Sequence, residues 1–381
     1  MKAKKDRRKK KVTPTFLLQR PTKKAELETK ELVPVGVASE YKSRKVSGVR
    51  DWPPYFFILS DQTTIVVSKD GSGDYSTISK AVSAIPDSSS ATYTIYIKKG
   101  TYSEAVDVGR EKKSVVFMGD GIDQTIIQFN KSNSTGYGTN VSATVNIEAQ
   151  KFVAKNISFV NTAGANAGQA VALRSIASND AYYKCSFEGY QDTLYVHSGT
   201  KLFYECNIYG TVDFIFGDAT SMFQNCNIYG RNPGKEGMPI VVTADRRDAA
   251  NSDTGIVIQN CTITAAPNFG PSNSNFRAFL GRPWREYSRV VVMESFLGNI
   301  VNPAGWAPWD KNSRLDHLSY IEYDNRGPGA ATSRRVKWPG FQIVTRSSQM
   351  LQFTAKNFIH ANDWLPSTGV PFIPGLTGDR K

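Results

Sequence analysis

One short recurring motif constrains the fold of this chain more than any other feature of its sequence. The motif is a polar residue, then Asn or Cys, then a polar-apolar pair. Its copies are KNISFV (155–160), KCSFEG (184–189), ECNIYG (205–210), NCNIYG (225–230) and NCTITA (260–265). Successive copies start 29, 21, 20 and 35 residues apart. A near-constant interval with occasional longer ones is typical of a solenoid, in which each coil lies over the previous one. The sequence therefore predicts a parallel β-helix.

The segments between the motifs support an all-β domain. Short runs of β-branched and aromatic residues alternate with Gly, Asn and Ser, and the Asn-Gly hairpin signals of a sandwich are absent. The runs expected as strands are 65–68, 93–97, 114–118, 144–147, 170–173, 201–204, 240–243, 255–258 and 289–293.

Helical spacing is clear only over 75–85, where four aliphatic residues from Ile78 to Ile85 share one face and Pro86 follows. A second helical turn is expected near 348–358. The predicted architecture is thus a β-helix with a short N-terminal helix and a C-terminal helical or loop segment.

The four cysteines occupy the same place in four copies of the motif, at Cys185, Cys206, Cys226 and Cys261. Stacked coils lie about 4.8 Å apart, and a disulfide needs Cα atoms about 4.4 to 6.8 Å apart. We therefore expect disulfides between Cys185 and Cys206 and between Cys226 and Cys261. Free thiols pointing inward are the alternative. Structural zinc is not expected, because the sequence has no CxxC or Cys/His cluster.

The first 60 residues differ in composition from the rest of the chain. Residues 1–50 carry 16 basic and 5 acidic side chains, and therefore most of the net charge of +13. Five prolines interrupt the first 60 residues. We expect 1–60 to be a solvated extension or pro-region remnant, rather than a nucleic-acid arm, and 61–381 to form the catalytic domain.

The sequence gives conflicting signals about location. No apolar run reaches the roughly 18 residues that a membrane-spanning helix needs, and no signal peptide is visible after Met1. A membrane is therefore not expected as a partner. Nucleic acid is not expected either, because most of the positive charge lies in the extension and the rest of the chain is nearly neutral. Five Asn-x-Ser/Thr sequons nevertheless favour a secreted glycoprotein. They begin at Asn130, Asn133, Asn140, Asn156 and Asn260.

Four polar residues are spaced by about one coil. Gln169 and Gln191 are 22 residues apart, and Asp192 and Asp213 are 21 apart. In a β-helix this spacing places them on three successive coils. Two neighbouring carboxyls drive their pKa values apart, so one becomes an acid and the other a base or nucleophile. The two amides can donate to an oxyanion, and Arg282 can keep the nucleophile charged.

This combination indicates acyl transfer from an ester. A ladder of stacked polar side chains without catalytic function is one alternative. A retaining glycosidase, which also needs two carboxylates about 5 Å apart, is another.

Five segments in order resemble the signature segments of plant pectin methylesterases. They are GTYSE (100–104), QAVALR (169–174), YQDTLYVHS (190–198), GTVDFIFG (210–217) and LGRPW (280–284). The resemblance extends from about residue 66 to 376, and it implies a right-handed parallel β-helix. It also implies hydrolysis of the methyl esters of homogalacturonan in the plant cell wall, without metal or organic cofactor.

The resemblance assigns roles to individual residues. It implies that Asp213 is the nucleophile, Asp192 the proton donor and acceptor, and Gln191 the stabiliser of the transition state. The residues implied to bind substrate are Thr139, Gln169, Arg282, Trp284, Tyr195, Phe216 and Trp306. A monomer that meets a proteinaceous inhibitor is expected. A polygalacturonate-cleaving β-helix enzyme and a non-catalytic pectin-binding protein are the competing hypotheses.

Overall fold

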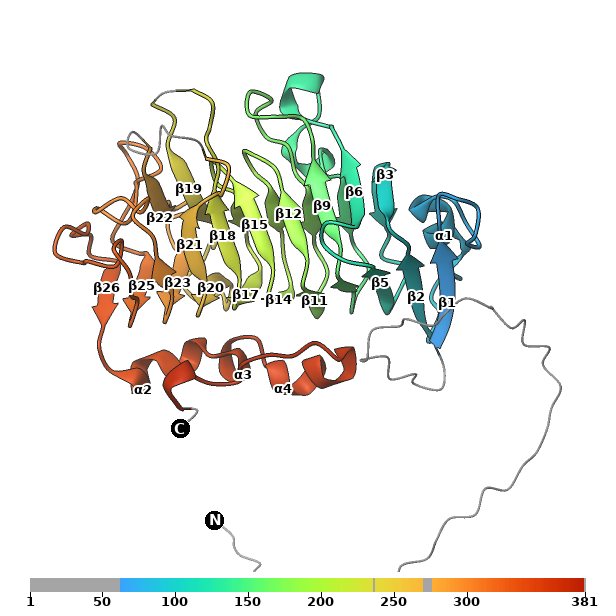
Figure 1. Cartoon of the computed structure of the whole chain (residues 1–381). Coiled ribbons are helices and arrows are strands. Elements are labelled where there is room, and N and C mark those ends of the chain that lie inside the picture. The colour runs from blue at the N-terminus through green and yellow to red at the C-terminus, as the bar shows by residue number, and fades with distance from the viewer. Residues whose placement is uncertain (1–61, 236, 270–275, 380–381) are drawn as a thin grey trace, which may run out of the picture. The chain divides into compact units, whose positions relative to one another are not determined.

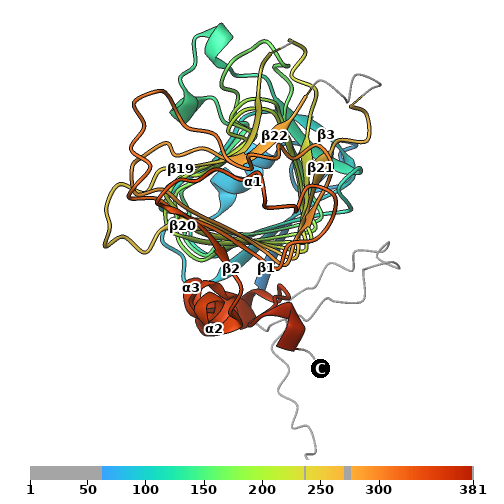
Figure 2. The same cartoon turned by 90° about the vertical axis from the view of Figure 1, so that its left-hand side faces the viewer.

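The computed structural model describes residues 62–235, 237–269 and 276–379 (Figure 1). The predicted extension 1–60 lies outside the described residues. Within them the chain coils repeatedly, and each strand pairs in parallel with its counterpart in the next coil. Figure 2 views the coils end-on, with the sheets stacked around a shared interior. The predicted right-handed parallel β-helix is confirmed.

Three sheets form the walls of the coil. The eleven-stranded sheet contains, in spatial order, β1 (Gln62–Val67), β2 (Thr92–Ile97), β5 (Val115–Gly119), β8 (Val153–Lys155), β11 (Asp180–Tyr183), β14 (Thr200–Tyr204), β17 (Thr220–Gln224), β20 (Gly255–Gln259), β23 (Arg289–Met293), β25 (Ser319–Tyr323) and β26 (Phe341–Val344). The seven-stranded sheet contains β22 (Ala278–Gly281), β19 (Ile240–Asp245), β16 (Ile215–Gly217), β13 (Leu194–Val196), β10 (Leu173–Ser175), β7 (Val145–Ile147) and β4 (Val106–Val108). The eight-stranded sheet contains β24 (Phe296–Leu297), β21 (Thr262–Ala265), β18 (Asn227–Gly230), β15 (Asn207–Gly210), β12 (Ser186–Glu188), β9 (Ser158–Asn161), β6 (Thr125–Phe129) and β3 (Gly100–Ser103).

The helices are short and lie outside the sheets. The α-helices are α1 (Ile78–Ala84), α2 (Ser347–Met350), α3 (Ala355–Phe358) and α4 (Ala361–Trp364). The 3₁₀ turns are η1 (Asn133–Thr135), η2 (Thr139–Val141), η4 (Leu351–Phe353), η5 (Leu365–Thr368) and η6 (Thr377–Asp379). In the described part of the chain, no helix is long and apolar enough to cross a membrane.

The recurring motif marks the corner between the eleven-stranded and eight-stranded sheets. The corner residue has a left-handed backbone in successive coils, with φ of +59° at Asn156, +50° at Lys184 and +53° at Glu205. Ser158 pairs with Ser186, 28 residues later. The predicted first interval of 29 was therefore wrong by one residue, because Asn156 is the counterpart of Lys184. A left-handed corner, which sequence spacing alone does not reveal, fixes the register.

All four cysteines are free and buried, so neither expected disulfide is present. The cysteines follow the corner residues and form an inward column. In-register parallel strands hold successive side chains about 4.8 Å apart and pointing the same way, whereas a disulfide needs Cβ atoms about 3.5 to 4.5 Å apart. Each thiol instead makes hydrogen bonds with backbone groups of neighbouring coils. The N–H of Cys206 donates to Sγ of Cys226 at 3.4 Å, and the N–H of Cys226 donates to Sγ of Cys261 at 3.3 Å.

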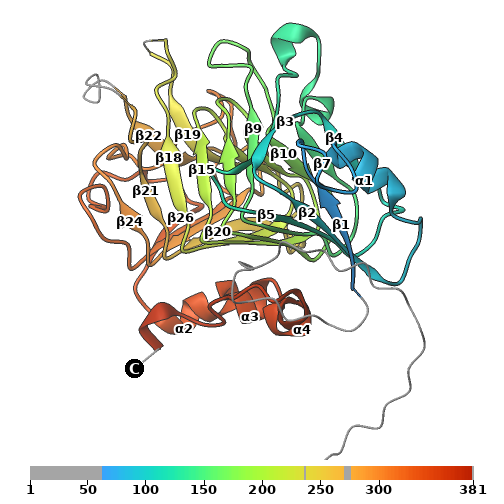
Figure 3. The same ribbon diagram turned by 45° about the vertical axis from the view of Figure 1, so that its right-hand side comes forward.

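The interior consists of apolar columns that run along the coil axis. Tyr182, Phe203 and Phe223 stack with ring centroids 4.7 and 4.5 Å apart. Such ring pairs contribute about 0.5 to 1.5 kcal/mol each beyond the burial of their area. At the N-terminal end, α1 packs against the first coils (Figure 3), and its predicted apolar face from Ile78 to Ile85 is buried.

The C-terminal segment runs beside the outer face of the eleven-stranded sheet (Figures 1 and 3). Its Phe353 and Leu365 are buried in one cluster with outward residues of the sheet such as Leu202. The amide of Gln224 fixes the segment, since Nε2 donates to the carbonyl of Ile373 at 2.8 Å and Oε1 accepts from its N–H at 2.9 Å. The C-terminal segment therefore covers outward residues of the eleven-stranded sheet.

Candidate active site

A groove of about 620 Å³ lies over the outward side chains of the seven-stranded sheet. Nine of the ten residues predicted for the site line it, which are Thr139, Gln169, Gln191, Asp192, Tyr195, Asp213, Phe216, Arg282 and Trp284. The tenth, Trp306, does not. The coil spacing read from the sequence thus brings together residues that are far apart along the chain.

Asp192 and Asp213 occupy equivalent places on adjacent coils. Each lies two residues before a strand, and those strands pair through Leu194 and Ile215. Both aspartates have a left-handed backbone, with φ of +62° and +52°. Asp tolerates this conformation better than most residues, because its short side chain can bond to nearby backbone. The conformation turns both carboxyls out of the strand direction and into the groove.

Arg282 binds the carboxylate of Asp213 with both arms of its guanidinium. Nε donates to Oδ1 at 2.8 Å and Nη2 donates to Oδ2 at 2.6 Å. Arg282 directly follows β22, which pairs with β19, and β19 pairs with β16 after Asp213. The arginine therefore reaches back over one intervening coil, where the small Ala244 lines the same groove.

The two carboxyls differ in their electrostatic surroundings. Burial and the nearby charge of Asp213 raise the pKa of Asp192 well above its ordinary value. Burial also raises the pKa of Asp213, but the hydrogen bonds and charge of Arg282 oppose that shift. Asp192 therefore holds its proton to higher pH than Asp213. The site presents one carboxylic acid beside one carboxylate.

Two amides and a hydroxyl add to the polar lining of the groove. Hydrogen bonding by the Gln191 side chain slightly opposes the rise in the pKa of the Asp192 carboxyl, while Gln169 lines the groove on the preceding coil. Thr139 belongs to η2, in the loop that borders the groove. A carboxylate nucleophile, a carboxylic acid and amide donors together suit acyl transfer.

The floor of the groove is aromatic. Tyr195 and Phe216 occupy paired positions on β13 and β16, and their rings stack with centroids 4.3 Å apart. Trp284 tilts against Phe216 at 6.1 Å. These rings belong to an outward cluster, separate from the core inside the coil. Aromatic faces of this kind suit the apolar faces of sugar rings.

The prediction that Trp306 lies in the groove was wrong. Trp306 is 1% exposed and packs in the interior against Tyr320. Trp309, three residues later in the same GWAPW segment, lines the groove instead. Its ring stacks with Trp284 at 6.4 Å, and the guanidinium of Arg282 lies 4.1 Å from its centroid. The segment pointed to the right loop, but sequence spacing did not decide which tryptophan faces outward.

His197 and Arg246 also line the groove, and sequence reasoning missed them. His197 stacks on Tyr195 at 4.5 Å and accepts a hydrogen bond from Nε of Arg174. Burial and the charges of Arg174 and Arg246 lower the pKa of His197 to about 4. It is therefore neutral near pH 7. The alternation of outward residues from Tyr195 in β13 to His197, directly after that strand, is the signal that would have identified it.

Among the described residues, no group of three or more Asp, Glu, His or Cys side chains is arranged to hold a metal ion.

The fold and the groove together define a β-helical protein with a paired-carboxylate site. The chain belongs to the pectinesterase family, whose sequence model matches residues 64–362. It is 50% identical over 315 residues to pectinesterase 2 of Citrus sinensis, covering 83% of this chain and 61% of that protein. It is 47% identical over 310 residues to the probable pectinesterase/pectinesterase inhibitor 39 of Arabidopsis thaliana, covering 81% of this chain and 58% of that protein. The chain thus spans about three fifths of the length of these two relatives.

Among solved structures, the pectin methylesterase from carrot superposes with a TM-score of 0.80 at 50% identity. The match covers 82% of this chain and 98% of the carrot chain.

Proposed function

We propose that this chain is a pectin methylesterase, which hydrolyses the C6 methyl esters of homogalacturonan to pectate and methanol. The observation that carries the proposal is the double hydrogen bond by which Arg282 holds the carboxylate of Asp213 beside the buried carboxyl of Asp192. Membership of the pectinesterase family supports the choice of ester.

In the acylation step, the Asp213 carboxylate attacks the ester carbonyl carbon and forms an anhydride bond as the bond to the methoxy oxygen breaks. Asp192 donates its proton to that oxygen, which leaves as methanol. The former carbonyl oxygen becomes negative in the tetrahedral intermediate, and the amides of Gln191 and Gln169 donate hydrogen bonds to it.

In the second step, Asp192 is a carboxylate and removes a proton from water as the water attacks the acyl carbon. The anhydride bond breaks, Asp213 leaves as a carboxylate, and the galacturonate carboxyl is released. Asp192 has regained its proton, so both groups return to their starting states. Neither a metal nor an organic cofactor is needed for these two steps.

The substrate chain lies along the aromatic floor, with Tyr195, Phe216 and Trp284 under the sugar rings. Thr139 borders the chain from η2, and Trp309 takes the place that sequence reasoning gave to Trp306. Arg282 contacts the substrate while orienting Asp213. The basic groups Arg246 and Arg285 at the groove suit a product that gains negative charge as esters are removed.

The protein acts, in this proposal, as a secreted monomer in the plant cell wall. A proteinaceous pectinesterase inhibitor is a candidate partner. In support, the name of the Arabidopsis relative joins a pectinesterase with a pectinesterase inhibitor.

Methanol release from methylated pectin tests the proposal. Wild-type protein should release methanol, whereas Asp213→Ala and Asp192→Ala should release none while keeping the wild-type circular dichroism spectrum. Wild-type turnover in either variant refutes the roles given to the two carboxyls.

The same preparations separate the alternatives. A polygalacturonate-cleaving enzyme would produce reducing ends or unsaturated products from demethylated substrate without methanol. A non-catalytic pectin-binding protein would bind the polymer and produce neither.

A further inference from the structure

One of the last coils carries a charged side chain in an interior column that is otherwise apolar. Strand pairing aligns Ile258 of β20, Val292 of β23 and Glu322 of β25 on one row. Glu322 is 2% exposed, and its cationic partner Arg335 is 5% exposed. A buried ion pair gains little or no stability over apolar residues of similar volume. Its presence at this position therefore calls for an explanation other than stability.

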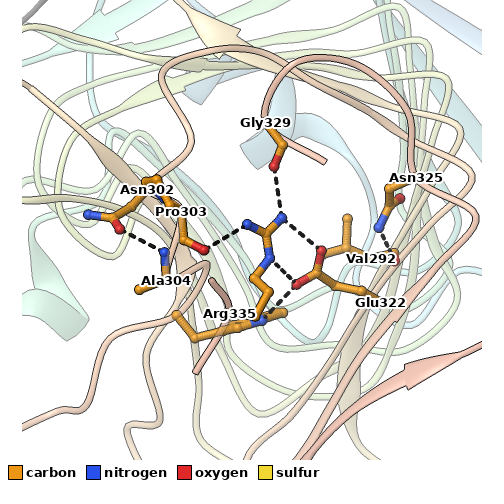
Figure 4. A network of polar contacts seen from close by, with 9 residues as sticks. Val292, Asn302, Pro303, Ala304, Glu322, Asn325, Gly329 and Arg335 are labelled. Atoms are coloured by element: carbon orange, nitrogen blue, oxygen red, sulfur yellow. Dashed lines mark hydrogen bonds and ion pairs between the residues drawn. The ribbon is translucent and has the colours of Figure 1, made fainter. Parts of the chain in front are cut away.

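The guanidinium of Arg335 ties three stretches of chain together. Nε lies 2.7 Å from Oε1 of Glu322, and Nη2 lies 3.0 Å from Oε2. The same group donates to the backbone carbonyls of Pro303 at 3.1 Å and Gly329 at 2.8 Å. Figure 4 shows Arg335 between these partners. Two of these four hydrogen bonds hold Glu322 of β25, one holds Gly329, and the one to Pro303 ties the segment 302–309 to them.

Trp306 adds a second link between this segment and the ion pair. Its Nε1 donates to Oε1 of Glu322 at 3.1 Å, and its ring lies 4.4 Å from that of Tyr320, on the same strand as Glu322. The segment passes close to Arg335, since a Cβ added to Gly305 would lie 2.4 Å from Cδ of the arginine. A larger residue has no room there.

The segment 302–309 is in turn bound to the strand that precedes Arg282. The N–H of Leu280 in β22 donates to the carbonyl of Gly305 at 2.7 Å, and the N–H of Ala307 donates to the carbonyl of Gly281 at 3.1 Å. Arg282 is the first residue after β22. The backbone just before Arg282 is therefore hydrogen-bonded to the segment that Arg335 holds.

The same segment also reaches the outer side of the arginine. Trp309 places its ring 4.1 Å from the guanidinium carbon of Arg282, on which the double hydrogen bond to Asp213 depends. Arg282 is thus restrained from two sides, by the backbone of 302–309 beneath it and by the indole of Trp309 beside it.

We infer that Glu322 and Arg335 are positioning residues for the acyl-transfer reaction, acting through the segment 302–309 to hold Arg282 against Asp213. The inference rests on the proposed function, because it assigns the pair a role in that reaction. Neither residue touches the groove. If the pair is lost, the segment loosens, Arg282 holds Asp213 less well, and the nucleophile takes up a proton more readily.

The double variant Glu322→Leu/Arg335→Met removes both charges and leaves no ion without a partner. It should fold with a melting temperature moderately below wild type. Apolar replacement of the ion pair itself is often neutral, but the carbonyls of Pro303 and Gly329 and Nε1 of Trp306 lose their partners. Its kcat for methanol release should fall about tenfold, the change expected when a positioned catalytic group loses alignment. The acid limb of the pH profile of kcat/KM should move to higher pH. Wild-type kcat with an unmoved acid limb would overturn the inference.

Lys201→Met is the matched control, since it breaks another buried ion pair, between Lys201 and Asp180 at 3.2 Å. This variant should lose stability but keep the wild-type pH profile. A shifted acid limb in this control would mean that the profile reports general loosening, and would overturn the inference as well.

If the double variant fails to fold, Trp306→Phe takes its place. Phenylalanine keeps most of the packing and removes only the hydrogen bond to Glu322. Its kcat should fall about threefold with the same upward movement of the acid limb. A folded Trp306→Phe variant with both quantities unchanged contradicts the inference.

Hydrogen exchange separates this inference from the proposed function. Peptides covering 278–309 should exchange faster in the double variant than in wild type, and this holds whether or not the wild type releases methanol. Absence of methanol release from wild type defeats the proposed function alone. Unchanged exchange in 278–309 defeats the positioning role, whatever the activity.

Discussion

Arg282 binds both carboxylate oxygens of Asp213, with Nε 2.8 Å from Oδ1 and Nη2 2.6 Å from Oδ2. The carboxylate is 7% and the arginine side chain 21% exposed, so solvent screens the pair weakly. Only a planar fork can reach both oxygens at once. This contact favours the charged form of a buried aspartate, which the nucleophilic role proposed for Asp213 requires.

Arg282→Lys should therefore be severely impaired. Lysine keeps the charge but can hold only one oxygen at a time, so we expect kcat for methanol release to fall about 100-fold. Arg110→Lys is the control, because the side chain of Arg110 is 79% exposed in its pair with Glu148. The control should match wild type. A loss of less than about threefold in Arg282→Lys would contradict the role of the fork.

The pH dependence of kcat/KM should be bell-shaped, with both limbs at higher pH than the ordinary pKa of a carboxyl group. Activity falls at low pH as Asp213 gains a proton and at high pH as Asp192 loses one. Burial raises the pKa of both groups, most strongly that of Asp192. The acid limb should lie above about pH 4, the ordinary range for a carboxyl. Initial rates on a soluble methylated oligogalacturonide give the profile, and the absence of a falling limb at high pH would contradict the acid role of Asp192.

Trp309 and Trp306 should respond in opposite ways to truncation. Trp309→Ala removes a groove ring 36% exposed, so kcat/KM should fall about tenfold with little change in stability. Trp306→Ala empties an interior site and should lower the free energy of unfolding by about 3 to 5 kcal/mol. Urea unfolding and methanol release, measured on both variants, provide the comparison. The reverse pattern would indicate that Trp306, and not Trp309, lies in the groove.

Asp245 should make the stability of the protein depend on pH. Burial raises its pKa to about 7, and its Oδ2 accepts the N–H groups of Arg247 and Arg289. Between about pH 4 and 7 the folded state holds a proton that the unfolded state lacks, so stability falls as pH rises through this window. Asp245→Asn cannot ionise and should not show the fall, a difference of up to roughly 4 kcal/mol.

Urea unfolding of wild type and Asp245→Asn between pH 5 and 8 checks this expectation. Other groups titrate in both proteins, so the difference between them isolates Asp245. Asp107→Asn, at an exposed position of β4, is the control and should leave the slope unchanged. Parallel curves for wild type and Asp245→Asn would show that Asp245 is already ionised in the folded state across this pH range, and would contradict the raised pKa.

The cysteine column should be insensitive to reductant. Because all four thiols are free, unfolding in denaturant without reductant should expose four groups that react with a thiol reagent. The melting temperature should be the same with and without dithiothreitol. Finding fewer than four reactive thiols, together with a lower melting temperature under reduction, would establish the disulfides that coil spacing suggested.

The coil period could be predicted from sequence, because every turn of a solenoid repeats the same pattern of buried positions and corner conformations. Interior positions must be apolar and corners must accept a left-handed backbone, so the same residue types return at intervals near one coil. That regularity placed Asp192 beside Asp213, whereas the roles of the individual site residues were implied by the resemblance to pectin methylesterases. It also gave the apolar face of α1 correctly, although the helix itself begins at Ile78 rather than near residue 75.

Periodic spacing was enough to predict the architecture and to bring Gln169, Gln191, Asp192 and Asp213 onto neighbouring coils. The direction in which individual side chains point within a coil became clear only from the three-dimensional structure. It placed Trp306 inside and Trp309 outside, and it kept the cysteines parallel and unpaired. It also buried Arg335 against Glu322, behind the segment that steadies Arg282. These outcomes depend on loop paths and Cβ directions between distant coils, which repeat spacing leaves undetermined.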